Sequence, residues 1–355
     1  MEWFLMIGIL VSKKGFKAIV KGRSKIEDLR HYKRFVNQHK MPVVFYYVSE
    51  NLLKNRAVQG FVVEPHQEPA VKEVQAPTHT FCRMIVGGRT KRRLKLLARR
   101  TKRRFYQLQS GRERDKWRHI VALNANEATS IFVPNSKRLT PDTFKEMIRK
   151  HGEVIIKPCR GSLGRRVIMI EKRGKRYKLS SKTKKKLVVK LVSAREVKGY
   201  IEALSKKRYI VQQKVRATKV NDQTIEVRAS TQKTTPTDWK VSAKALRLSR
   251  KGDFLTNISK GAKGVPFKTH YFKQANVNDV VEKTSVALAK QLSKAIPAID
   301  FGFDLMVDER GKVWFIEANL RDMKLTYMWA GEYELWYQSI AQPLRFIASE
   351  MKKAK

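Results

Sequence analysis

The sequence contains few acidic residues, few cysteines and no long apolar run. Among 355 residues it has 31 Asp and Glu against 77 Lys and Arg, and only two cysteines, Cys82 and Cys159. Two such cysteines exclude a disulfide framework and a cysteine-based metal site, and they favour a reducing, cytoplasmic compartment. The apolar run from Trp3 to Val11 has no basic residue before it and is too short to span a bilayer. We therefore expect no secretion signal and no transmembrane segment, and we expect this run to form a first buried strand.

Apolar residues and positive charge are plentiful. The chain is 42% hydrophobic and 9% aromatic, which is enough for more than one buried core and excludes a disordered or fibrous protein. The formal net charge of +46 attracts polyanions or anionic surfaces. Basic residues gather in Lys91–Arg104, nine of fourteen, and in Glu171–Lys190, ten of twenty. These runs indicate either an acidic polymeric partner or a solvated basic surface. Specific nucleic-acid recognition is not expected, because the runs are not interleaved with aromatic residues and no helix-turn-helix or RNA-binding signature occurs.

The spacing of apolar residues predicts a mixed α/β chain. The N-terminal part alternates short apolar runs with polar helical stretches, which predicts a small parallel α/β unit followed by a basic amphipathic helix. The strands expected there are Phe4–Val11, Val43–Val48 and Val58–Val63, and the helices are Lys25–Asn37 and Lys91–Arg104. Farther on we expect helices to Asn124 and over Pro141–His151, Ala194–Ser205 and Val280–Ile296, with strands over Val154–Ile156, Val167–Ile170, Tyr209–Gln213, Ile225–Gln232, Lys240–Ser249, Phe303–Val307 and Val313–Ala318.

A loop between two apolar strands carries the sharpest motif. Lys157 ends the first strand, and the small-residue loop Gly161–Gly164 follows it. Glycines at both ends of that loop let the backbone approach a ligand, its amides and Ser162 can hydrogen-bond phosphate oxygens, and Lys157 supplies charge. The loop is not a Walker P-loop, since no Gly-Lys-Ser/Thr follows and the loop joins two strands. A tight hairpin with an exposed lysine explains these residues about as well as a phosphate cradle does.

A second motif lies in the C-terminal hairpin. If Glu309–Lys312 form a four-residue loop, Asp304 lies opposite Glu317, and Asn319 falls on the same face. Two facing carboxylates in apolar strands repel one another and lose hydration unless a cation lies between them. Oxygen ligands of this kind suit Mg²⁺ or Mn²⁺ bridging substrate phosphates. The alternative is a solvated strand face on which lysines pair with these acids.

Three further polar patches are weaker signals when taken alone. Gln212 and Gln213 end an apolar strand and can present backbone groups to a purine. Glu226 and Arg228 share a strand face, which is most often a surface ion pair. Asn257 opens a polar loop that suits either an anion or an ordinary connection.

The order of these motifs is more specific than any one of them. Along the chain they are Asp115-Lys116-Trp117, the Pro134 region, Lys157-Pro with Gly161–Gly164, Val211-Gln212-Gln213, Glu226-Val-Arg228, Asn257–Gly261, and Gly302–Asp304 with Glu317–Asn319. The ordered set resembles the ATP-grasp superfamily, and most closely the YheC/YheD family of endospore coat-associated proteins, over nearly the whole chain. The resemblance implies an α/β (α+β) ATP-grasp fold with an N-terminal Rossmann-like domain and the nucleotide between two antiparallel sheets. The implied domains are residues 1–110, 111–210 and 211–350, the last carrying the metal site.

The resemblance also implies roles for individual residues. The implied roles are phosphate binding by Lys116, Lys157, Gly161, Ser162 and Gly164, adenine binding near Gln212, Gln213 and Val215, Mg²⁺ or Mn²⁺ binding by Asp304, Glu317 and Asn319, and stabilisation of the transferring phosphoryl group by Arg228 and Asn257. The implied activity is ATP-dependent ligation of a carboxylate to an amine through an acylphosphate, with both substrates unknown. Residues 320–324 depart from the proline-containing turn usual in the family. The alternative is therefore a non-catalytic spore-coat protein that keeps the fold, with coat components or an acidic polymer as its partners.

Overall fold

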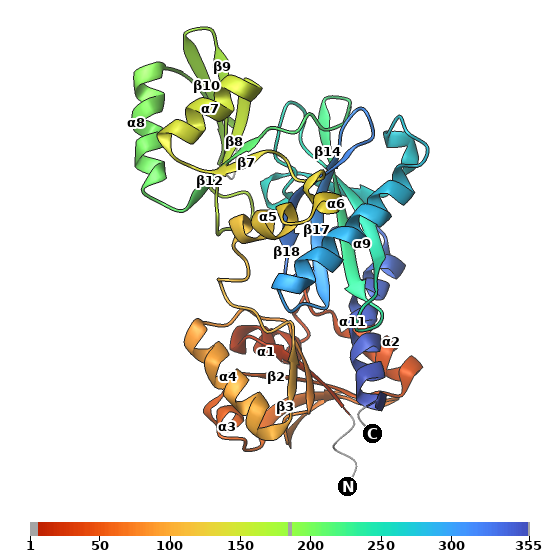
Figure 1. Cartoon of the computed structure of the whole chain (residues 1–355). Helices are drawn as coiled ribbons and strands as arrows, with labels where there is room; N and C mark the ends of the chain where they lie inside the picture. Colours follow the sequence, from red (N-terminus) through yellow and green to blue (C-terminus); the bar gives the residue numbers. More distant parts are fainter. Residues whose placement is uncertain (1–5, 184–186, 354–355) are drawn as a thin grey trace.

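Three β-sheets organise the protein, seen here in a computed structural model that describes residues 6–183 and 187–353. Figure 1 shows them as three bodies, with the N-terminal one (red to orange) below the central one (yellow to green) and the C-terminal one (cyan to blue). The central and C-terminal sheets are antiparallel, which confirms the predicted mixed α/β fold. No helix among the residues just given is long and apolar enough to cross a membrane.

The N-terminal sheet has the strand order β4-β3-β2-β1-β5-β6. Its elements are β1 (Ile7–Val11), α1 (Lys13–Val20), α2 (Leu29–His39), β2 (Val43–Tyr47), α3 (Glu50–Leu53), β3 (Val58–Val63), β4 (Ala70–Val74), β5 (His79–Cys82), α4 (Gly88–Thr101) and β6 (Arg104–Tyr106). The predicted parallel pairing holds for β1, β2, β5 and β6 but is wrong for β3, which pairs antiparallel with β2 and β4. The connections on both sides of β3 are short, and parallel neighbours need a longer crossover.

Two further predictions for this domain concern its first strand and its basic helix. The predicted first strand begins at Phe4, which lies outside the described residues, and the observed strand begins at Ile7. The basic amphipathic helix is confirmed as α4, in which Leu94 and Leu97 are buried while most of its basic residues are exposed. The predicted end at Arg104 is wrong, because Lys102 takes the left-handed conformation that ends the helix and Arg104 begins β6.

The central sheet forms a separate lobe with its own core. Its elements are β7 (Ser136–Arg138), α7 (Pro141–His151), β8 (Glu153–Pro158), β9 (Ile168–Arg173), β10 (Arg176–Lys182), β11 (Leu187–Ser193), α8 (Ala194–Ser205) and β12 (Tyr209–Gln213). Both helices have the predicted bounds because capping boxes at Thr140 and Ser193 fix their starts. The basic run that begins at Glu171 folds into β9, β10 and β11, although its residues 184–186 lie outside the described part.

The C-terminal sheet has the order β16-β15-β14-β17-β18, with β13 paired to β14. Its elements are β13 (Lys219–Val220), β14 (Gln223–Lys233), β15 (Trp239–Leu248), η1 (Ile258–Lys260), β16 (Lys263–Pro266), η2 (Thr269–Tyr271), α9 (Val277–Ala295), β17 (Asp300–Val307), β18 (Val313–Asn319) and α10 (Leu325–Trp329). Helices α5 (Lys116–Asn124) and α6 (Glu127–Ser130) pack against α9. Through Ile120 and Leu123, α5 belongs to the same core as Phe301 and Leu288, although it precedes the central sheet in sequence.

The last helix, α11 (Tyr333–Lys353), joins the N-terminal and C-terminal bodies. It packs against β14 and β15 on one side and against α2, β1 and β5 on the other. Trp336 and Phe346 therefore share a core with Ile9 and Phe35 of the first domain and with Ala245 of β15. Figure 1 shows α11 in blue running from the C-terminal body to the N-terminal one. These two bodies thus share a core, and the cleft left for a ligand lies against the central lobe.

Candidate functional site

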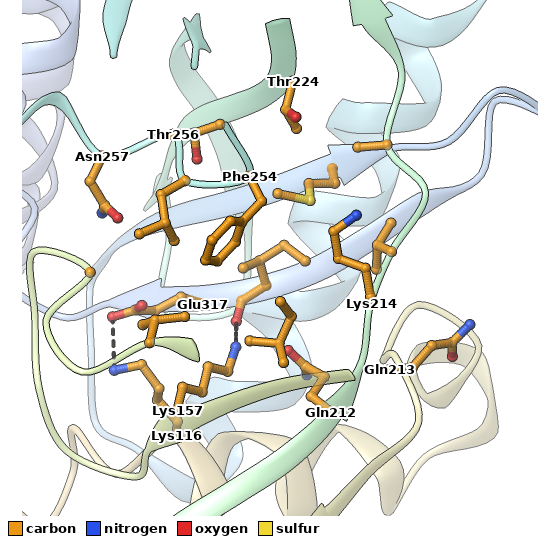
Figure 2. Close-up of a pocket in the computed structure, with 18 of the residues that line it drawn as sticks. Lys116, Lys157, Gln212, Gln213, Lys214, Thr224, Phe254, Thr256, Asn257 and Glu317 are labelled. Atoms are coloured by element: carbon orange, nitrogen blue, oxygen red, sulfur yellow. Dashed lines mark hydrogen bonds and ion pairs between the residues drawn. The ribbon is translucent and has the colours of Figure 1, made fainter. Parts of the chain in front are cut away.

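A cavity of about 510 Å³ lies between the central and C-terminal sheets. Strands β8 and β12 form one wall, and β17, β18 and the loop after β15 form the other. Apolar side chains line much of it, namely Ile155, Val215, Phe254, Leu255, Met306 and Ile316. Figure 2 shows Lys116, Lys157 and Glu317 together at one end of this cavity. An apolar slot with a cationic end suits a ligand with a flat ring and a charged tail.

Two lysines from different elements meet at that charged end. Lys116 is the first residue of α5, and its Nζ donates to the Gly161 carbonyl at 2.9 Å and lies 3.3 Å from Glu317 Oε1. Lys157 comes from β8, and its Nζ donates to the Ile316 carbonyl at 3.1 Å. Burial lowers the pKa of Lys157 to about 8, with Lys116 also lowering it and Glu317 opposing the change. The structure thus brings the two predicted lysines to the same cavity.

The β17–β18 hairpin brings the predicted acids face to face. Asp304 is the register partner of Glu317, as predicted. The hairpin that pairs them does not have the expected four-residue loop. Val307 pairs with Val313, and a bulge shifts the register between Asp304 and Leu305. The bulge leaves Ile316 without a partner on β17, so its carbonyl is the one that accepts from Lys157.

Asp304 also belongs to a buried cluster of charges. Its Oδ1 lies 3.0 Å from Arg228 and 3.3 Å from Arg247, and Arg247 donates to Glu226 at 2.8 Å. Burial, together with the charge of Asp304, raises the pKa of Glu226 to about 7. Sequence reasoning missed Arg247, because no motif surrounds it. Its place in the charge cluster follows only from the strand pairing, in which Arg247 lies opposite Glu226.

The residues at this end fit a divalent cation. Asn319 donates to Asp304 Oδ2 at 3.1 Å, so two carboxylates and an amide gather on one hairpin. Asp304 Oδ1 is buried and faces Arg228 and Arg247 without an aligned hydrogen bond, so a metal there would share this oxygen with the two guanidinium groups. Within residues 6–183 and 187–353, no three His, Cys, Asp or Glu side chains form a metal cluster. A site with two carboxylates and substrate phosphates is the usual arrangement for Mg²⁺.

The loop between β8 and β9 lies close to Asn257. Gly161, Ser162 and Gly164 line the cavity, and so does Asn257. Gly164 has φ +61°, and a Cβ on it would lie 2.3 Å from Asn257 Oδ1. The loop therefore approaches Asn257 as closely as it does only because residue 164 has no side chain.

Gly164→Ala is expected to lower the free energy of unfolding by about 2 kcal/mol, because alanine is strained at positive φ and collides with Asn257. The matched control is Gly174→Ala in the β9–β10 turn, where φ is +57° but a Cβ meets nothing within 4 Å. Urea unfolding of both variants separates the strain they share from the collision. Equal losses in the two proteins would contradict the close contact.

The predicted adenine-binding residues lie at the end of β12 and just after it. Gln212, Gln213 and Val215 all line the cavity. The Gln212 side chain donates to Ser136 Oγ at 2.8 Å, and Gln213 Oε1 accepts from the backbone N–H of Asn135 at 3.3 Å. Figure 2 shows the Gln213 side chain directed away from the two lysines. Lys214, in the segment after β12, also lines the cavity.

The chain also matches proteins of known class. Residues 107–349, more than half of the chain, match the model of the YheC/D-like ATP-grasp family. Over 218 residues the chain is 26% identical to the endospore coat-associated protein YheD of Bacillus subtilis (strain 168). That match covers 58% of this chain and 48% of YheD, so the chain spans about half the length of this relative.

Solved structures support the fold over nearly the whole chain. The ATP-grasp ligase PsnB complexed with its minimal precursor is 14% identical, with a TM-score of 0.55, and the match covers 96% of this chain and 99% of PsnB. The VanG D-Ala:D-Ser ligase of Enterococcus faecalis is 10% identical, with a TM-score of 0.54 and coverage of 96% and 99%. At such identities the likeness shows the shared fold alone.

Proposed function

Because the chain belongs to the YheC/D-like ATP-grasp family, we propose that it binds ATP with Mg²⁺ and joins a carboxylate to an amine through an acylphosphate. One observation carries the proposal: two lysines from separate elements converge with Glu317 at one end of an apolar cavity, and Asp304 lies opposite Glu317 on the neighbouring strand. A structural role alone does not explain why so many charges are placed beside an open cavity at a cost in hydration.

In this proposal the adenine occupies the apolar slot and the phosphates reach Lys116 and Lys157. The loop over Gly161–Gly164 covers the terminal phosphates with its backbone amides. Asp304, Glu317 and Asn319 hold Mg²⁺ or Mn²⁺, which neutralises phosphate charge. The chain thus contributes mainly position and positive charge to phosphoryl transfer.

The reaction proposed has two steps. A carboxylate oxygen of one substrate attacks the γ-phosphorus, and the bond to the leaving ADP oxygen breaks. An amine nitrogen then attacks the acyl carbon, loses a proton and displaces phosphate. Arg228 and Asn257 lie next to the acids and the loop, where they stabilise negative charge on the transferring group.

We also propose where the protein is located and what it binds, from its net charge and from its relatives. YheD is named for the endospore coat, and this chain carries a net charge of +46. Association with the spore coat or with an acidic polymer fits both facts. The basic face of α4 is the surface proposed for that contact, since its arginines and lysines are largely exposed.

Calorimetric titration with a nonhydrolysable ATP analogue tests the nucleotide site. We expect saturable one-to-one binding that Mg²⁺ strengthens by at least about tenfold, and in Glu317→Ala we expect this Mg²⁺ gain to disappear. Without Mg²⁺ the variant should bind the analogue at least as tightly as the wild type, because a carboxylate that repels the phosphates is gone. Moderately high salt is needed to suppress loose binding of polyphosphate to so basic a protein.

Glu309→Ala is the matched control. Glu309 lines the same cavity but lies in the β17–β18 turn, so its loss should leave the Mg²⁺ gain unchanged. Weak binding that does not depend on Mg²⁺ in the wild type or in either variant would refute the enzymatic proposal. It would favour a coat protein that only keeps the fold. Binding with the expected pattern would justify assays of phosphate release with pools of carboxylates and amines.

A further inference from the structure

A second cavity, of about 380 Å³, adjoins the first. Ser162, Asn257 and Glu317 line both. The second cavity also contacts Asp304 and Asn319 and extends from there to the segment after β18 and to α10. A molecule held in it would therefore lie at the phosphate end of the proposed nucleotide site.

Most charges in this second cavity are already paired. Asp304 is paired with Arg228 and Arg247, and Asp322 lies 3.5 Å from Lys324. Glu317 is paired with Lys116 at 3.3 Å. Each of these cations is therefore already paired with an acid of the protein and is not free to bind an acidic ligand.

Two arginines of the second cavity are not paired in this way. Arg114 and Arg321 both line the cavity, and across residues 6–183 and 187–353 neither has an ion pair or a side-chain hydrogen bond. The Nε of Arg321 is buried without an acceptor, which is costly for a donor. Burial lowers the pKa of Arg321, and the charges of Arg83 and Arg114 lower it further while Glu27 opposes them. Two arginines that line one cavity without an acid partner indicate an anion-binding site.

The remaining lining indicates that the anion is organic. Trp329 and Met323 are 45% and 36% exposed at this cavity, and Leu163 and Ile258 add further apolar surface. Arginine forks match a planar carboxylate with two parallel hydrogen bonds. The combination suits a small carboxylic acid with an aliphatic body.

We propose that Arg114 and Arg321 bind a second, non-reacting carboxylate of the substrate, so that the ligase accepts dicarboxylic acids or acidic amino acids rather than simple monocarboxylates. The inference rests on the proposed function and specifies its substrate class. The reacting carboxylate lies toward Arg228 and Asn257, and the second carboxylate lies toward the guanidinium pair. An acidic substrate of this kind also agrees with the strongly basic chain.

The test compares two probes of matched shape, glutarate and its monoamide glutaramate. Calorimetry in moderately high salt, with Mg²⁺ and the ATP analogue saturating, measures the affinity of each. We expect the wild type to prefer glutarate by at least about tenfold, the range for a charge-assisted hydrogen-bonded pair. Arg321→Gln and Arg114→Gln should each remove most of that preference, and Arg321→Lys should retain part of it.

Arg149→Gln is the charge-matched control, because Arg149 is exposed on α7 and does not line the cavity. It should keep the full preference for glutarate, and all variants should bind the ATP analogue as the wild type does. If the analogue binds but the wild type does not distinguish the probes, or binds neither, the inference is wrong and the nucleotide function stands. Equal competition by inorganic phosphate would also overturn it, since the pair would then be a general anion site. Failure to bind the analogue would instead remove the proposed function.

Discussion

Lys324→Met is expected to lower the free energy of unfolding by about 3–5 kcal/mol, the range for breaking a buried ion pair. Its Nζ lies 3.0 Å from Asp300 and 3.5 Å from Asp322, and all three side chains are almost fully buried. Although burial favours the neutral acid, Lys324 and Arg228 hold the pKa of Asp322 well below its usual range. Without the ammonium group two buried carboxylates would face each other. Urea unfolding near neutral pH measures the loss.

Two further proteins make this prediction specific. Lys33→Met removes a lysine paired with Glu68, whose side chain is 90% exposed, and it should change stability by less than about 0.5 kcal/mol. The double variant Asp322→Asn with Lys324→Met removes one repelling carboxylate along with the ammonium, so it should recover part of the loss. An additive double variant would show that Lys324 and Asp322 do not interact.

Lys157→Met is expected to weaken binding of the ATP analogue by about 10- to 150-fold, which corresponds to the loss of a hydrogen bond to a charged group. Lys157 is 5% exposed and lies at the cationic end of the cavity, where a phosphate is the natural partner. Calorimetry in moderately high salt measures the change. Lys207→Met, which removes an exposed lysine after α8, is the control and should bind as the wild type does.

The pH dependence of binding provides an independent readout for Lys157. Its pKa of about 8 means that the free protein loses this positive charge as the pH rises above 8. Because the phosphates bind the charged form better, wild-type affinity should fall by up to about tenfold per pH unit above that value. Lys157→Met has no such proton to lose, so its affinity should stay flat over the same range. A parallel fall in both proteins would assign the effect to other groups.

Residues 320–324 illustrate what the sequence alone did not explain. They depart from the turn usual in the family, a departure that by itself favours the non-catalytic alternative. In the structure the Asp322 carbonyl accepts from Arg83 at 2.9 Å, and the Asp322 side chain accepts from Ser230. Arg83 in turn donates to Glu27 at 3.0 Å. The departure thus forms a buried polar connection between the N-terminal domain and the candidate site.

Elements with strong local signals were predictable. Helices α7 and α8 and strand β12 have the predicted bounds, because caps at Thr140 and Ser193 and a continuous apolar run act within a few residues. The pairing of Asp304 with Glu317 was also predictable, since a hairpin keeps its partners close in sequence. Its bulge was not, because no residue type demands it, yet the bulge is what presents the Ile316 carbonyl to Lys157.

The sequence by itself determined the fold class, the order of the motifs and the residue types that phosphate and Mg²⁺ chemistry requires. Only the tertiary structure decided which charges are already satisfied and which remain free. Arg247 is taken by Glu226 and Asp304, whereas Arg114 and Arg321 have no acid partner in the described ranges. In sequence these arginines look alike, because a guanidinium group has the same chemistry everywhere. What differs is the set of partners that distant strands bring within reach, and that set exists only after the three sheets have packed together.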